Sequence, residues 1–116
     1  MGLAGQIAPP SRQEVLTEKF FEVLSKYYIK ERSVAFYAEK LCLTPKYLSM
    51  TVKKVTGFPI TSWMNEVVII EAKRLLKMTD STVLQISEEL NFPNPSFFGR
   101  FFKQYAGMTP LAYRNS

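Results

Sequence analysis

The sequence contains no histidine among its 116 residues and only one cysteine, Cys42. The lack of histidine excludes Ser-His-Asp triads, histidine general bases and histidine-ligated zinc. A single cysteine forms neither an intrachain disulfide nor a thiolate metal cluster, so we expect no metal or cofactor and a reducing cytoplasmic environment. No apolar run approaches the ~20 residues that span a bilayer, so no membrane partner is expected. A glycine-rich phosphate loop and a nucleophile motif are also missing, and we expect the chain not to be an enzyme.

Acidic residues are fewer than basic ones, with 10 Asp and Glu against 15 Lys and Arg, which gives a net charge of +5. A basic excess on so short a chain indicates a polyanionic partner. The hydrophobic fraction of 47% is typical of a folded domain rather than a disordered segment. We interpret residues 1–13, which are rich in glycine and proline, as a linker or cloning remnant, with a frayed end as the alternative. Residues 14–116 are then one folded domain.

Apolar residues recur with helical spacing, and no segment alternates as a strand does. Two capping-box spacings and three polar residues followed by proline predict helix starts, because the polar side chain caps the helix and proline is tolerated in its first turn. These starts are Ser11–Glu14, Thr82–Gln85, Thr44-Pro45, Asn94-Pro95 and Thr109-Pro110. Glycines that follow two of the helices, Gly57 and Gly107, predict their ends. Residues 67–70 are β-branched and also fit a strand, but the helix-favouring residues that follow favour a helix.

These signals predict an all-α fold of seven helices. Their expected ranges are 12–31, 34–41, 45–56, 61–78, 83–90, 95–106 and 110–115. In the first helix, the residues expected to form the buried stripe are Leu16, Phe20, Val23 and Tyr27. In the second, we expect Ala35, Ala38 and Leu41 to face inward.

A weak internal repeat of about fifty residues organises the rest of the chain. Residues 38–43 align with residues 87–92 at an offset of 49, and after one inserted residue the offset is 50 as far as Trp63 and Tyr113. Each copy has a short helix, a tight turn and a second helix that starts with proline, the pattern of a helix-turn-helix. The two units are expected at about 34–57 and 83–107, joined by the helix at about 61–78. Eighteen residues give a spacer of roughly 27 Å, which suits second helices about 34 Å apart in successive major grooves.

The second helix of each copy divides into two faces. The residues expected to pack inward are Leu48, Val52, Val55, Phe98, Phe102 and Tyr105, and we expect Trp63 and Tyr113 to lie in the core. The outward stripes at i, i+3, i+4 and i+7 contain no acid and consist of Lys46, Ser49, Met50, Lys53, Ser96, Gly99, Arg100 and Lys103. One basic face is often only a solvated surface. Two basic faces in register within a repeat favour binding to duplex DNA, whose phosphates attract cations.

We assign base contacts and phosphate contacts separately. The residues expected to face bases are Lys46, Ser49, Met50, Ser96, Gly99 and Arg100. Those expected to face phosphates are Lys53, Lys54, Thr61, Lys103 and Thr109. Arg100 either binds guanine bidentately or holds a phosphate, and Met50 is either a spare apolar surface residue or a contact to a thymine methyl group. The alternative function is a helical protein–protein interaction module that uses the aromatic-rich segment 97–105.

The stretch from about Val34 to Arg114 resembles the DNA-binding domain of AraC/XylS-type transcription regulators. The residues that carry the resemblance are 86–92, 96–103 and 107–114, together with 47–49, Lys53-Lys54, Gly57 and 72–76. The resemblance implies two helix-turn-helix units that bind neighbouring major-groove segments of double-stranded DNA in the cytoplasm, at the nucleoid. It also implies transcription regulation, most often activation through RNA polymerase, and in most members an additional N-terminal effector or dimerisation domain. Family members often have arginine in place of Met50, so a direct guanine contact is not expected from this position of the first unit, whereas the second unit keeps Arg100.

Overall fold

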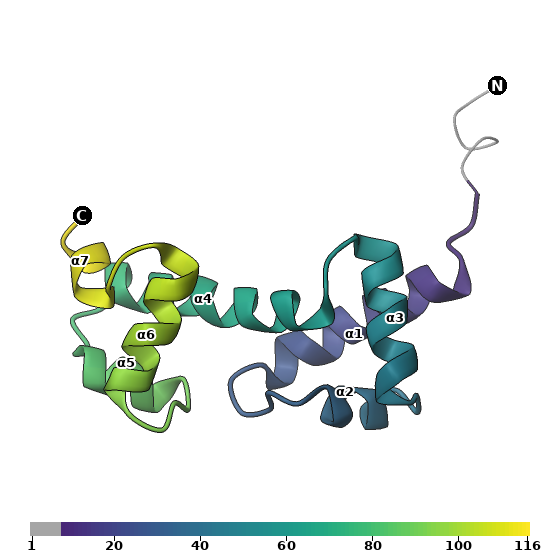
Figure 1. Cartoon of the computed structure of the whole chain (residues 1–116), viewed down its shortest axis with the longest axis horizontal. Coiled ribbons are helices and arrows are strands. Elements are labelled where there is room, and N and C mark those ends of the chain that lie inside the picture. The colour runs from purple at the N-terminus through teal and green to yellow at the C-terminus, as the bar shows by residue number, and fades with distance from the viewer. Residues whose placement is uncertain (1–7) are drawn as a thin grey trace. The chain divides into compact units, whose positions relative to one another are not determined.

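The computed structural model describes residues 8–116, and these residues form seven α-helices and no β-strand (Figure 1). The helices are α1 (Arg12–Tyr27), α2 (Val34–Lys40), α3 (Pro45–Thr56), α4 (Ile60–Met78), α5 (Val83–Glu89), α6 (Pro95–Ala106) and α7 (Pro110–Arg114). The predicted all-α class with seven helices is therefore confirmed. Residues 1–7, the larger part of the predicted linker, lie outside the described residues. Within the described part of the chain, no helix combines the length and apolar character that a bilayer crossing requires.

The helix starts follow from local capping hydrogen bonds. The Ser11 backbone N–H donates to Glu14 Oε1 at 2.8 Å, and the Glu14 N–H donates to Ser11 Oγ at 3.1 Å. The backbone and side-chain hydrogen bonds from Ser11 hold the pKa of the Glu14 carboxyl below its usual value. Thr82 and Gln85 form the second capping box, with the corresponding distances of 2.8 and 3.0 Å. Both capping boxes predicted from the residue spacing are thus confirmed.

The end of α1 differs from the prediction. The helix ends at Tyr27 rather than near residue 31, and the N–H groups of Lys30 and Glu31 both donate to the Tyr27 carbonyl. The following turn is fixed by Arg32, whose guanidinium donates to backbone carbonyls of that turn and to the Leu90 carbonyl. Packing of this turn against the distant α5–α6 turn ends the helix, and local sequence gives no signal of such a contact.

The chain divides into two compact units. The first contains α1 up to Lys26 and Ser33–Thr61, and the second contains Tyr27–Arg32 and Ser62–Ser116. In the first unit Phe20, Leu24 and Tyr37 are buried, and the Phe20 and Tyr37 rings meet edge to face with centroids 5.7 Å apart. Burial of Leu16 and Phe20 confirms part of the predicted α1 stripe, whereas Val23 and Tyr27 are only half-buried and the buried Leu24 was not predicted. In α2, Tyr37 and Ala38 are buried while Ala35 is exposed, so the inward face was only partly predicted.

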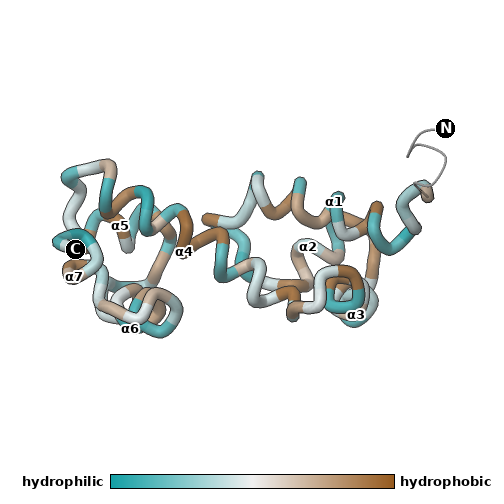
Figure 2. Tube along the Cα trace, turned by 90° about the horizontal axis from the view of Figure 1, so that it is seen from above, coloured by the Kyte–Doolittle hydropathy of each residue, from teal (hydrophilic) through white to brown (hydrophobic). Residues whose placement is uncertain are grey.

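The second unit has a larger, aromatic core. Its buried residues come from α4, α5, α6 and the turn between α5 and α6. Hydrophobic residues of α4 are coloured brown in Figure 2. They are Val68, Ile69, Ala72, Leu75, Leu76, Ile86, Leu90, Phe92, Phe98 and Phe102. The Arg32 guanidinium lies 4.7 Å from the centroid of the Phe92 ring and so adds a cation–π contact at the edge of this core. Tyr28 and Ile29, from the turn after α1, also pack against the cluster.

Four aromatic or aliphatic residues expected in the core are less buried than predicted. Val55 and Tyr105, near the ends of α3 and α6, are 37% and 44% exposed. The partner helices α2 and α5 have only seven residues each, about 10 Å of helix, too short to cover the last turn of a twelve-residue neighbour. Trp63 and Tyr113 are half-buried, and the Tyr113 ring packs at the edge of the second core.

Candidate nucleic-acid interface

The second helices of the two predicted helix-turn-helix units, α3 and α6, are built from the same local signals. The Thr44 hydroxyl accepts the Tyr47 N–H at 3.1 Å, and the Asn94 side-chain oxygen accepts the Phe97 N–H at 2.7 Å. Both helices have proline in the first turn and twelve residues in all. Both end at a left-handed glycine with φ of 83° at positions 57 and 107. Because each cap is encoded within a few residues, the sequence repeat produces two helices of equal length and similar ends.

The turn before each of these two helices is also duplicated. Cys42 and Asn91 have positive φ values of 58° and 63°, as expected for a tight turn. The next residue in each copy donates its N–H back to the first helix of its unit, Leu43 to the Ala38 carbonyl at 2.8 Å and Phe92 to the Ser87 carbonyl at 2.9 Å. Ala38 and Ser87 are fully buried, and small residues there allow the two helices of each unit to pack closely.

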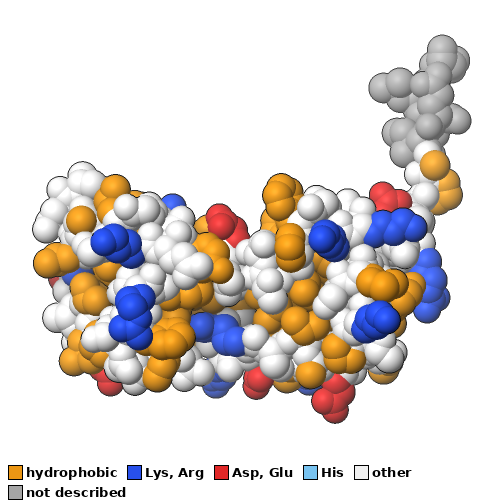
Figure 3. Space-filling view, in the orientation of Figure 1, with side chains coloured by type: hydrophobic (Ala, Val, Ile, Leu, Met, Phe, Trp, Pro, Cys, Tyr) orange, Lys and Arg blue, Asp and Glu red, His pale blue; other side chains and the backbone are white. Residues whose placement is uncertain are grey.

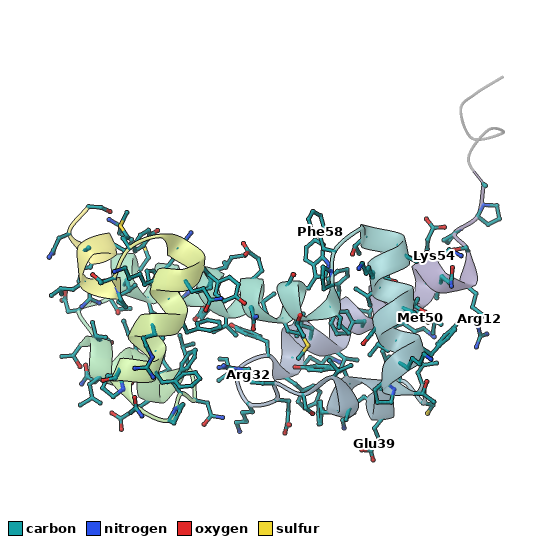
Figure 4. All side chains as sticks on the ribbon, viewed as in Figure 1. Arg12, Arg32, Glu39, Met50, Lys54 and Phe58 are labelled. Atoms are coloured by element: carbon teal, nitrogen blue, oxygen red, sulfur yellow. The ribbon has the colours of Figure 1, made fainter. Side chains whose placement is uncertain are left out.

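Within the first unit, α3 buries Leu48 and Val52 and turns its lysines to solvent. Lys46, Lys53 and Lys54 are exposed, Met50 is 55% exposed and Ser49 is half-buried. Met50 and Lys54 project on the same side of the helix (Figure 4). Residues 44–57 contain no acid, so this face is uniformly positive. Three flexible ammonium groups beside a thioether are suited to attracting phosphates, and none of them is the planar donor fork of a guanidinium.

Within the second unit, α6 buries Phe98 and Phe102 and exposes Ser96, Arg100 and Lys103. Lysine and arginine side chains lie over this helix in the space-filling view (Figure 3). The Arg100 guanidinium lies 5.9 Å from the centroid of the Phe97 ring, one turn earlier on the helix. This cation–π contact restricts the guanidinium, which offers the forked donors that match guanine O6 and N7 or a phosphate.

The remaining predicted contact residues lie at helix starts. Thr61 is exposed near the start of α4 in the first unit. Thr109 is exposed in the second unit, and its hydroxyl oxygen accepts the Ala112 N–H at 3.1 Å as the cap of α7. Its oxygen is therefore engaged within the chain. None of the residues assigned to DNA contact is buried, and each stripe lies on a single helix.

Sequence reasoning missed two residues on the exposed face of α6. Phe97 is 46% exposed, and Gln104 is exposed at the position equivalent to Lys54 in the first copy. Together with Arg100 and Phe101 they line a shallow surface hollow. The offset of 50 would have identified Gln104, since its counterpart Lys54 was already assigned to phosphate contact. An exposed glutamine beside an arginine adds the side-chain amide that pairs with adenine.

A family model described as "Helix-turn-helix domain" matches residues 37–116. The chain is 29% identical to the uncharacterized HTH-type transcriptional regulator YisR of Bacillus subtilis, over 90% of this chain and 37% of that protein. It is 30% identical to the arabinose operon regulatory protein of Escherichia coli, over 70% of this chain and 28% of that protein. The chain thus spans 28% to 37% of the length of these two curated relatives.

Similarity also extends to a solved structure, the C-terminal domain of the two-component response regulator yesN from Fusobacterium nucleatum. Its TM-score with this chain is 0.79 and its sequence identity is 30%. The match covers 84% of this chain and 95% of that chain. The similarity therefore includes nearly all of a domain that stands at the C-terminus of a longer regulator.

Proposed function

Since the chain belongs to the family of AraC-type helix-turn-helix DNA-binding transcription regulators, we propose that it binds a specific double-stranded DNA site with both α3 and α6. Each helix enters the major groove, and the two occupy neighbouring groove segments of one site. The activity is binding rather than catalysis. The observation that carries the proposal is the duplicated turn and cap geometry, which presents an acid-free outward face on each of the two helices.

The contact residues divide by chemistry into those that face bases and those that face phosphates. Base contacts come from Lys46, Ser49 and Met50 on α3 and from Ser96, Gly99 and Arg100 on α6. Phosphate contacts come from Lys53, Lys54, Thr61, Lys103 and Thr109. Exposure of the charged members and the absence of acid from both helices support their contact with DNA. Thr109 contributes through its hydroxyl proton, because its oxygen already caps α7.

The wider role proposed for the protein is activation of transcription through contact with RNA polymerase, in the cytoplasm at the nucleoid. The chain spans only part of the length of its curated relatives. We therefore also propose that the DNA-binding domain acts with an additional N-terminal effector or dimerisation domain. An operator-dependent reporter, assayed with purified polymerase and with or without the protein, separates activation from repression.

Selection from a randomised duplex library tests the DNA-binding proposal. The expected product is a site of two short elements separated by about one helical turn, ~10 bp centre to centre. The apparent affinity for that site falls steeply with salt concentration, because cationic side chains release counterions from the phosphates. Recovery of a single short element contradicts simultaneous binding by both helices. No enrichment, together with salt-independent binding to random duplexes, contradicts DNA binding itself.

The second candidate function is a protein–protein interaction module, which the exposure of Phe97 and Tyr105 on α6 favours. Against it, Phe98 and Phe102 are buried and Phe101 packs against the same core. Tyr105 is also engaged, because its hydroxyl accepts the Asn65 side-chain N–H at 2.6 Å. The salt titration separates the two functions, since an aromatic interaction surface gives little affinity for random duplexes and no steep salt dependence.

A further inference from the structure

Gly99 occupies an interior position of α6 where the fold has no need of glycine. The helix runs from Pro95 to Ala106, and glycine weakens a helix interior because it gives up the most backbone freedom on folding. Gly57 and Gly107 adopt a positive φ, but Gly99 does not. Its backbone is therefore one that any helix-forming residue adopts.

Packing does not require glycine at this position either. A Cβ atom placed on Gly99 meets no atom within 4 Å outside the adjacent residues and the nearby backbone of its own helix. The first copy of the repeat confirms that the scaffold tolerates a side chain, because Ser49 stands at the equivalent place in α3. The positions where the helices pack closely are Ser87 and Ala38, whose side chains are fully buried.

Because Gly99 has no side chain, it leaves a gap on the outward surface of α6. Ser96 lies three residues before it and Lys103 four residues after it, so all three share one side of the helix. In the proposed function, Ser96 faces a base and Lys103 faces a phosphate. The gap at Gly99 therefore lies between the base-facing and phosphate-facing parts of the surface.

We propose that Gly99 is a positioning residue that allows the DNA to approach the backbone of α6 closely. Without a side chain at this point, the helix lies deep enough in the major groove for Ser96 and Arg100 to reach base edges. Any side chain at position 99 holds the helix away from the duplex and weakens all of its contacts together. This inference rests on the proposed DNA-binding function and adds to it the steric requirement of one groove contact.

The test uses the full chain with Gly99 replaced by Ala, Ser or Leu, and the duplex recovered by the wild-type protein in the library selection. Without DNA, Gly99→Ala raises the folding equilibrium constant roughly fivefold, because alanine is the better helix former. With DNA, it lowers the affinity by a factor of about 5 to 100, the range for forcing a group into a close-packed contact. Gly99→Leu keeps the helix stable and lowers the affinity further. Opposite changes in folding and binding are the expected signature.

A matched control separates close approach from a general effect of helix stability. Ser25→Ala replaces an exposed residue of α1 and also improves helix propensity, and its affinity for the duplex stays that of the wild type. Wild-type or higher affinity in Gly99→Ala and Gly99→Leu overturns the inference and leaves the proposed function intact. If the wild-type protein itself recovers no duplex, the proposed function fails first. Gly99→Ser keeps the test valid should one of the other variants fold poorly.

Discussion

The helices α3 and α6 have nearly the same scaffold and different outward faces. Both begin with a capping side chain and proline, both have twelve residues, and both end at a glycine with φ of 83°. On the outward face, α3 has three lysines and Met50. On the equivalent stripe, α6 has Arg100, Lys103 and Gln104. A few turn, cap and core positions therefore fix the helix-turn-helix, and the solvent-facing positions vary without changing it.

This difference in chemistry suggests a difference in role. Lysine presents a compact charge on a flexible stem, whereas the guanidinium of arginine is a planar fork that matches guanine and phosphate. We expect α3 to contribute mainly electrostatic affinity and α6 to contribute most of the discrimination between sequences. The buried faces of the two helices also differ. The residues buried on α3 are Leu48, Thr51 and Val52, and those buried on α6 are Phe98 and Phe102.

The largest expected effect tests whether the two units are independently stable. Phe98→Ala removes a fully buried ring from the second unit and should lower the free energy of unfolding by about 3–5 kcal/mol. Denaturant unfolding measures the loss, and hydrogen exchange locates it. We expect amides of α5 and α6 to lose protection while those of α2 and α3 keep it. Phe97→Ala, at a 46% exposed neighbour, is the control. Equal loss of protection in both units would show that they unfold as one.

A change at Arg100 tests the division of labour directly. Arg100→Ala should relax discrimination at one base-pair position and cost about 1–3 kcal/mol of binding free energy on the preferred site. Met50→Ala, at the equivalent position of α3, should have a smaller effect and leave the other preferences unchanged. Binding titrations on the preferred duplex and its single base-pair variants measure both. Equal weakening by Arg100→Ala on every duplex would assign Arg100 to a phosphate instead.

The third prediction concerns a buried side-chain oxygen of the first core, the one such side-chain atom without a hydrogen-bond partner among the described residues. Thr51 is fully buried and its hydroxyl has no hydrogen-bond partner. Thr51→Val preserves the shape and should raise the free energy of unfolding by about 1 kcal/mol. Thr17→Val is the matched control, because the buried Thr17 hydroxyl donates to the Gln13 carbonyl at 2.9 Å and its loss gives no gain. A destabilised Thr51→Val would indicate that the hydroxyl has a partner in solution.

The smallest effect concerns the two lysines that the repeat places at equivalent positions. Lys53→Ala and Lys103→Ala should each reduce the slope of log affinity against log salt by about one and leave sequence preference unchanged. Affinities measured at several salt concentrations give the slopes. Lys26→Ala, at the exposed end of α1, should leave the slope as it is. A change in preference in either variant would move that lysine from the phosphates to a base.

Much of the fold was predictable because its signals are local. Each cap, such as Thr82 with Gln85, is formed by residues three apart, so the sequence contains both partners of the hydrogen bond. The end of α1 was not predictable, because Arg32 reaches the Leu90 carbonyl across 58 positions of sequence. The exposure of Val55 and Tyr105 was missed because it depends on where a short partner helix stops. Gln104 was missed although the repeat pointed to it.

The order of amino acids alone determined the helical class, the duplication, and the presence of basic residues without acidic ones on α3 and α6. These follow from caps, spacing and residue type, which act over a few positions along the chain. Tertiary structure decided which apolar residues are covered, where α1 ends, and that Gly99 faces open space. Those outcomes depend on atoms brought together from distant parts of the chain, and no local pattern specifies them.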